Sequence, residues 1–453
     1  MRFLPPDEPV DLYKASFGDD LLGRTDVSKA LSDVLERVED PLVVALDGRW
    51  GTGKSYFLKR WVGAHRQENG GRALTVYFDA FAHDYLSDPL VALISALSER
   101  IPKAEKPKLD RLKKVAFKLL KPATRVGLSL ATYGLTEALN GIGDVAAEAA
   151  KGEAQKAVDG FWRREEGRQA AMEEFRAAIT TLTTPAGQEG ATPLIIVIDE
   201  LDRCRPDYAL EVLEIIKHFF AVPHVHFVLG VNLKALENSV KARYGAEIDA
   251  TSYLQKFLSF TLNLPDDIGD HDRTPSVIRY AKHLGLQMAT PDHLLSEVVS
   301  QLKVLARQSH ISIRDVGKVM STVALLPEAA QDPGRAKGLQ IIAITMIITK
   351  VIRPDIFLKL IDASVQDREL VAYMGASSEC IDERLQSGDY NQNYDHEVFV
   401  LYSVWNFIRL DGVSGGDENL KSVAGIFGNF RIISAKQMPQ IIHKDWLSIF
   451  KFS

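Results

Sequence analysis

Cysteine is nearly absent from this chain of 453 residues, which contains only Cys204 and Cys380. Two cysteines so far apart in the sequence exclude a disulfide framework and a cysteine-based zinc site. Long hydrophobic runs are also missing, because no stretch reaches the roughly 18 apolar residues that a membrane-spanning helix needs. The first residues lack the apolar stretch of a signal peptide. These absences together predict a cytoplasmic protein in a reducing compartment.

An excess of positive charge is missing as well, since 54 Lys and Arg stand against 60 Asp and Glu and the net charge is −6. This composition excludes a protein that is basic over its whole surface, as many nucleic-acid-binding proteins are, but it permits a local basic patch. Hydrophobic residues make up 46% of the chain. That fraction is enough for a substantial core, and the length predicts roughly two or three domains.

Short apolar segments that are typical of buried parallel strands occur at four places along the chain. Segments with a helical pattern separate them, so the sequence predicts an α/β fold with a mostly parallel sheet. The strand segments are residues 41–46, 73–78, 194–198 and 226–231. We expect the core to comprise residues 1–100 and 191–265, with an inserted helical element at 101–190, a helical segment at 266–330 and a mostly helical C-terminal domain at 331–453.

The inserted element begins with a strongly basic stretch. Residues 103–125 carry nine Lys and Arg against two acidic residues, a net charge of +7. Three interpretations are open: a solvated helix that docks its apolar side on the core, a helix lying on an anionic membrane surface, or a site for nucleic-acid phosphates. The part that follows has Gly127, Gly134 and Gly141 seven residues apart, a spacing that lets a second helix approach closely.

The strongest functional signal follows the first strand segment. Residues 48–55 read Gly-Arg-Trp-Gly-Thr-Gly-Lys-Ser, a full match to the phosphate-binding pattern G-x-x-x-x-G-K-[ST]. Its glycines let the backbone curl so that N–H groups point at phosphate oxygens, and the next helix adds the positive end of its dipole. We expect Lys54 to reach the β- and γ-phosphates and Ser55 to ligate Mg²⁺. The predicted nucleotide-binding residues here are Gly48, Trp50, Gly51, Thr52, Gly53, Lys54, Ser55 and Tyr56.

Two carboxylates, Asp199 and Glu200, follow the third strand segment. Ligands bind beyond the carboxyl ends of the strands in such sheets, so we predict that Asp199 holds Mg²⁺ together with Ser55. Glu200 is predicted to polarise the attacking water, which makes it catalytic together with Lys54. Asn232 ends the fourth strand segment, where it either senses the γ-phosphate, as a third catalytic residue, or forms a turn.

Taken with their flanks, these motifs resemble the KAP family of P-loop NTPases. Trp50 matches the tryptophan of the family's pattern G-x-W-G-x-G-K-[ST], and residues 199–204 match its D-D-L-D-R-C motif except at Glu200. Residues 78–81 and 253–257 resemble two further motifs of the family. Asn232 stands where the family commonly has Asp.

The resemblance implies an ATP-hydrolysing α/β core followed by a helical lid. It implies a nucleotide contact for Arg24, which ends a motif beside the base, and for Arg314, the basic residue of the lid. Many members carry membrane-spanning helices between the two motifs, but acidic residues interrupt that stretch here. Bacterial members are often linked to phage exclusion, so a role in anti-phage defence is an expectation of the resemblance.

We therefore predict an ATPase whose nucleotide cycle drives a conformational or assembly change, with a protein partner or a homo-oligomer. Two alternatives are open, a nucleotide-bound scaffold with little turnover and an ATPase stimulated by nucleic acid. The expected cofactor is Mg²⁺ with ATP. We predict no separate metal site, because no histidines have the spacing of metal ligands. Residues 103–125 offer a contact for nucleic acid or for the inner face of the membrane, where the protein would be peripheral.

Overall fold

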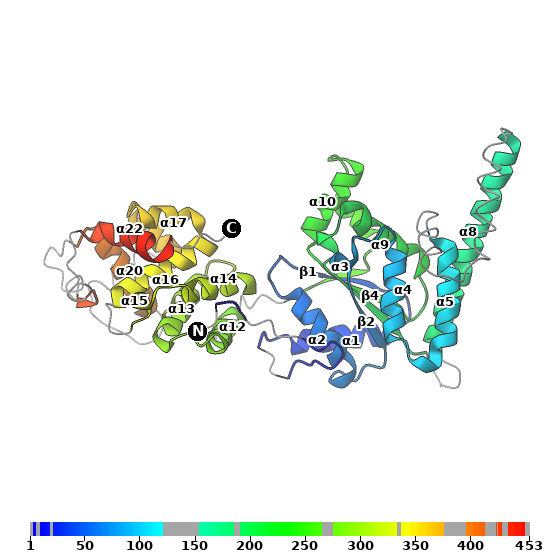
Figure 1. The fold of residues 1–453 in the computed structure, drawn as a ribbon, viewed down its shortest axis with the longest axis horizontal. Helices are drawn as coiled ribbons and strands as arrows, with labels where there is room; N and C mark the ends of the chain where they lie inside the picture. Colours follow the sequence, from blue (N-terminus) through cyan, green and yellow to red (C-terminus); the bar gives the residue numbers. More distant parts are fainter. Residues whose placement is uncertain are drawn as a thin grey trace. The chain divides into compact units, whose positions relative to one another are not determined.

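The chain forms two compact units in the computed structural model (Figure 1). Unit 1 comprises Met1–Pro9, Leu21–Gly23 and Pro265–Ser453, and unit 2 comprises Val10–Asp20 and Arg24–Leu264. The residues that the structure describes are 3–5, 10–18, 21–120, 154–184, 191–264, 275–332, 337–375, 396–412, 423, 425–427 and 434–448. Within these ranges, no helix combines the length and the apolar character that crossing a membrane requires.

Unit 2 is built on a five-stranded parallel sheet with the strand order β2-β3-β4-β1-β5. The strands are β1 (Val43–Asp47), β2 (Leu74–Asp79), β3 (Leu194–Asp199), β4 (Val225–Val231) and β5 (Phe260–Asn263). Every residue of β3 and β4 is buried, which explains why these strands read as continuous apolar runs. The predicted α/β fold with a mostly parallel sheet is confirmed.

The edge strand β5 was not among the strands predicted from the sequence. It pairs with β1, and most of its residues are exposed. An exposed edge strand lacks the continuous apolar run that identifies a central strand. The sequence signal was therefore too weak to separate it from a loop.

Hydrophobic side chains cover both faces of the sheet. Ile195 and Val197 of β3 belong to one hydrophobic cluster, and Ile196 and Ile198 belong to another, because successive side chains of a strand point to opposite faces. Helices α1 and α2 supply the first cluster, and α4, α9 and α10 supply the second. The helices of this core are α1 (Thr25–Arg37), α2 (Lys54–Gln67), α3 (Ala80–His83), α4 (Pro89–Arg100), the 3₁₀ turn η3 (Leu201–Arg203), α9 (Pro206–Phe219), α10 (Leu233–Tyr244) and α11 (Ala250–Gln255).

The described part of the inserted element consists of η1 (Lys103–Glu105), α5 (Lys106–Leu119) and α8 (Ala154–Thr183). Leu112 and Val115 of α5 are buried in one hydrophobic cluster with Phe175 and Ile179 of α8. The apolar side of the basic helix thus packs on the core, as the first of the three interpretations expects. The Gly127, Gly134 and Gly141 stripe lies outside the described residues.

The described residues of unit 1 form helices joined by loops, with no strand, and they share one hydrophobic cluster. Helix α16 lies at its centre, with every residue from Gly338 to Thr349 buried, and it packs against α13, α14, α17, α20 and α22. Helices from both sides of residue 330 share this cluster, and the predicted division there stays a prediction. The elements are α12 (Ser276–Gln287), α13 (Asp292–Ala306), α14 (Ile313–Ala324), α15 (Glu328–Gln331), α16 (Lys337–Ile352), α17 (Pro354–Ile361), α18 (Asp367–Met374), α20 (His396–Arg409), η4 (Ala435–Gln437), α22 (Met438–Ile442) and the π-helical η5 (His443–Leu447).

One buried histidine of the sheet predicts how stability depends on pH. His226 in β4 is fully buried, and burial lowers its pKa from 6.5 to about 4. Its Nδ1 accepts a hydrogen bond from the backbone N–H of Leu42 at 3.3 Å, so the folded protein holds a neutral ring. Between these two pKa values the unfolded chain binds more protons than the folded one, and stability falls as the pH falls.

We expect His226 to lower the free energy of unfolding by about 2 kcal/mol between about pH 7 and pH 4.5. Urea unfolding at the two pH values measures this change. The matched chain carries His226→Gln, which keeps a neutral hydrogen-bonding side chain, and its stability should depend less on pH by the same amount. Equal pH dependence in both chains would contradict the assignment.

Candidate nucleotide-binding site

The glycine-rich loop lies between β1 and α2, at the carboxyl end of the sheet. Gly51 and Gly53 adopt φ values of 90° and 83°, in the left-handed region that other residues rarely enter. A Cβ at Gly48 would lie 3.1 Å from the Thr52 hydroxyl oxygen, and this hydroxyl donates to the Arg49 carbonyl at 2.9 Å. The backbone conformation thus favours glycine at positions 51 and 53, and the Thr52 hydroxyl leaves little room for a Cβ at position 48.

Lys54 begins α2 and is buried against the loop. Its ammonium group donates to the carbonyl oxygens of Gly48 and Arg49, the latter at 3.1 Å. Burial lowers the pKa of Lys54, and the nearby Asp202 and Asp199 carboxylates oppose this shift. The lysine is thus held at the loop, with its charge facing the acidic end of β3.

Asp199 ends β3 and is only 1% exposed. The Tyr77 hydroxyl donates to its Oδ2 at 2.7 Å, and the backbone N–H of Glu200 donates to its Oδ1 at 2.9 Å. A Cβ at Gly230 of the neighbouring strand would lie 2.4 Å from the same Oδ1. Burial nevertheless raises the pKa of the Asp199 carboxyl, because the charged form is poorly solvated there.

Glu200 follows in a left-handed conformation, with φ at 59°. This turn brings its carboxylate to 3.5 Å from the Ser55 hydroxyl and into an ion pair with Arg203 at 3.0 Å. Burial raises the pKa of Glu200, and Arg203 opposes the shift. The structure therefore brings Ser55, Asp199 and Glu200 together from two distant parts of the sequence.

Trp50 links the loop to the segment after β3. Its indole N–H donates to Asp202 Oδ2 at 2.6 Å, while the side chain stays half-exposed. Asp202 itself is buried. The sequence motif placed Trp50 at the nucleotide, and the structure adds that its ring connects the two motifs.

Arg24 binds the end of the loop, directly before α2. Its guanidinium group donates to the carbonyl oxygens of Thr52 at 2.6 Å and Gly53 at 3.1 Å. Arg24 is buried. A contact between Arg24 and a nucleotide base stays a prediction of the family resemblance.

The other predicted residues lie in different surroundings. The Asn232 side-chain oxygen accepts a hydrogen bond from the Ala235 N–H at 3.3 Å and caps α10, so its sensor role stays a prediction. Tyr56 is half-buried, with the Arg60 guanidinium 4.6 Å from its ring centre. Arg314 belongs to unit 1, where it is exposed in the first turn of α14.

The donor set at this edge of the sheet fits Mg²⁺. The Ser55 hydroxyl and the Asp199 carboxylate are oxygen ligands of the kind that Mg²⁺ prefers, and nucleotide phosphates and water usually complete its shell. A cation beside the buried Asp199 would offset the cost that raises its pKa. In the described part of the chain, no cluster of three or more His, Cys, Asp or Glu forms a metal site without the nucleotide.

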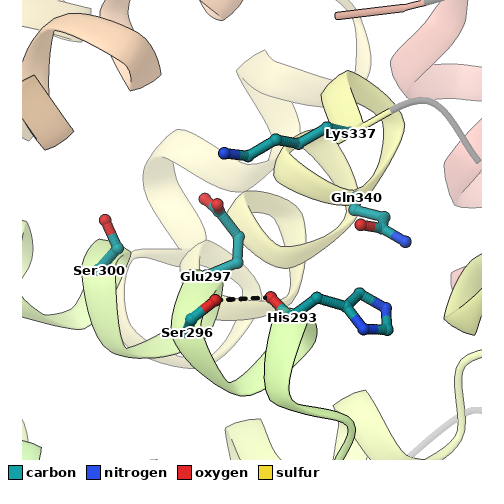
Figure 2. A pocket seen from close by; sticks show the side chains of 6 residues that line it. All are labelled: His293, Ser296, Glu297, Ser300, Lys337 and Gln340. Carbon is teal, nitrogen blue, oxygen red and sulfur yellow. Dashed lines mark hydrogen bonds between the residues drawn. The ribbon is translucent and has the colours of Figure 1, made fainter. Parts of the chain in front are cut away.

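A separate hollow with a volume of about 430 Å³ lies in unit 1 between α13 and α16 (Figure 2). Figure 2 shows Lys337 extending over Glu297, and burial raises the pKa of the Glu297 carboxyl. The lining of this hollow contains none of the residues predicted to bind nucleotide. The lining residues are His293, Ser296, Glu297, Ser300, Lys337 and Gln340.

The sequence was also compared with known protein families and structures. The model of the KAP family P-loop domain matches residues 24–328, which is more than half of the chain. The chain therefore belongs to the KAP family, as the motifs predicted. Among curated proteins, none matches the chain in sequence.

Among solved structures, the chain is similar to the ORC2 protein of Aeropyrum pernix in its ADPNP–ADP complexes. The two are 14% identical with a TM-score of 0.33, over 92% of this chain and 94% of that one. The chain is also similar to Cdc6p from Pyrobaculum aerophilum, with 12% identity and a TM-score of 0.37, over 96% of this chain and 97% of that one.

Proposed function

We propose that the chain binds ATP with Mg²⁺ and hydrolyses it, and that this cycle acts as a conformational or assembly switch. The observation that carries the proposal is the position of Glu200, which directly follows the buried Asp199 and lies 3.5 Å from the Ser55 hydroxyl. A carboxylate at this place can accept a proton from a water that attacks the γ-phosphate.

ATP would bind through the loop between β1 and α2. The curled backbone supplies N–H groups for the phosphates, and the start of α2 supplies a positive dipole end. Lys54 would exchange the carbonyl oxygens of Gly48 and Arg49 for charged phosphate oxygens, which form stronger hydrogen bonds. Ser55 and Asp199 would hold Mg²⁺, which when bound neutralises charge on the phosphates.

A switching role is supported by the partners that two of these side chains already have. Lys54 is bonded to loop carbonyl oxygens, and Glu200 is paired with Arg203. Both would change partners when ATP binds, and the Trp50 contact with Asp202 would carry a change in the loop to the segment after β3. We infer that the readout is an interaction with a protein partner or with further copies of the chain.

The ion pair of Glu200 and Arg203 also favours a second candidate, a nucleotide-bound scaffold with little turnover. While the Glu200 carboxylate is paired with Arg203, it is not available to activate a water. A nucleic-acid-stimulated ATPase is a third candidate, because Lys106, Lys113 and Lys114 are exposed on α5 while its apolar side is buried. A cytoplasmic or peripheral location and a role in anti-phage defence rest on the sequence and the family resemblance.

Phosphate release from ATP by the purified chain tests the proposal. We expect turnover with Mg²⁺ and its loss when EDTA removes the metal, because without the cation the phosphate charge is not neutralised and the Asp199 carboxylate would repel it. ATP binding without turnover would favour the scaffold. Turnover that rises when DNA or RNA is added would favour the nucleic-acid-stimulated ATPase.

A further inference from the structure

Tyr77 carries a hydroxyl group that no sequence motif assigns to the site. It lies in β2, which pairs with β3 so that Tyr77 is opposite Val197 and Asp79 is opposite Asp199. The ring therefore reaches two residues along the neighbouring strand, towards the carboxyl end, and its hydroxyl donates to Asp199 Oδ2 at 2.7 Å.

The Asp199 carboxylate receives hydrogen bonds from the Tyr77 hydroxyl, the Ser55 hydroxyl and the backbone N–H of Glu200. Asp199 Oδ1 accepts from the Glu200 N–H at 2.9 Å, but the same N–H also donates to the Gly230 carbonyl at 3.1 Å. The Tyr77 hydroxyl is hydrogen-bonded to Asp199 alone in the described structure. The Tyr77 hydroxyl and the Glu200 N–H donate to different oxygens of Asp199. The carboxylate is therefore fixed in rotation as well as in position.

Further contacts hold Tyr77 within β2. The backbone N–H of Tyr77 donates to the Tyr13 hydroxyl at 3.0 Å, and the Arg100 guanidinium lies 3.6 Å from the centre of the Tyr13 ring. The Lys59 ammonium lies 5.7 Å from the centre of the Tyr77 ring. These contacts come from three separate segments, so the surrounding fold holds the Tyr77 ring in place.

We propose that Tyr77 is a positioning residue for magnesium, whose hydroxyl holds the Asp199 carboxylate in the orientation that takes up the nucleotide's Mg²⁺. A neutral donor suits this task, because it orients the carboxylate without neutralising the charge that attracts the cation. Removing a residue that is hydrogen-bonded to a metal ligand typically weakens metal binding about 10- to 100-fold. The inference rests on the proposed nucleotide site.

The test compares the wild-type chain with Tyr77→Phe, which removes one oxygen atom and keeps the ring. A fluorescent ATP analogue is titrated onto each chain in EDTA, and again at rising Mg²⁺ concentrations. We expect Tyr77→Phe to need about tenfold more Mg²⁺ for the same gain in nucleotide affinity, with affinity in EDTA unchanged. A wild-type chain that binds the analogue without any effect of Mg²⁺ would contradict the proposed site itself.

Tyr208→Phe is the matched control, because the Tyr208 hydroxyl is buried without a hydrogen-bond partner among the described residues. This variant should behave as the wild type does. In an Asp199→Asn background, Tyr77→Phe should cause no further loss, since the carboxylate that it positions is gone. A normal Mg²⁺ dependence in Tyr77→Phe would overturn the inference, and so would a chain that no longer folds, because the hydroxyl would then serve the fold.

Discussion

Replacement of Glu200 by Gln is expected to lower the turnover of ATP by at least about a hundredfold, because the loss of a general base typically costs a factor of 10²–10⁴. The amide keeps the size of the side chain but cannot take a proton from water. The phosphate loop, Ser55 and Asp199 are unchanged, so the dissociation constant of ATP should stay within a few-fold of the wild type. Phosphate release measures the first quantity, and a fluorescent ATP analogue measures the second.

The matched control is Glu214→Gln, the same chemical change at an exposed position of α9. It should leave turnover and binding unchanged. If Glu200→Gln turned over ATP at the wild-type rate, Glu200 would not be the base. A wild type and a Glu200→Gln variant that both bind ATP without turnover would instead support the scaffold.

The second large effect is expected for Lys54→Ala, which should weaken ATP binding roughly 10- to 100-fold, as the loss of a charged hydrogen bond predicts. The stability of the chain without nucleotide should change little. Burial already disfavours the Lys54 charge, as its lowered pKa indicates, and this cost opposes the loss of its bonds to the loop carbonyl oxygens. Binding and stability should therefore respond separately.

Titration of the fluorescent ATP analogue and thermal unfolding of the same samples check this expectation. Lys29→Ala, an exposed lysine of α1, serves as the control and should change neither quantity. ATP binding of normal strength by Lys54→Ala would show that the loop does not hold the phosphates. A large loss of stability would assign Lys54 to the fold.

The central part of the fold could be predicted because its signals are local. Strands that are buried on both faces read as apolar runs, and the loop motif needs glycine and lysine at fixed spacing. The strand β5 escaped prediction because exposure breaks its apolar pattern. The helices of the insert could be expected as helices, whereas the packing of α5 on α8 depends on contacts between residues far apart in the sequence.

The supporting contacts of the site could not be predicted for a related reason. Tyr77 reaches Asp199 only because β2 and β3 pair in parallel with one particular register. Trp50 meets Asp202 across more than a hundred residues of sequence. A sequence motif identifies residues at fixed short spacing. It does not identify the contacts that form only in the tertiary structure.

Gly230 in β4 limits how sequences with this fold can diverge. The strand separates β1 from β3, and a Cβ at position 230 would collide with both Asp199 Oδ1 and Leu58 Cδ1. Glycine is otherwise unfavourable inside a strand, so its presence here reflects the close approach of the carboxylate. Positions 58, 199 and 230 are therefore expected to vary together during evolution, and a relative with a larger residue at 230 should differ at both 58 and 199.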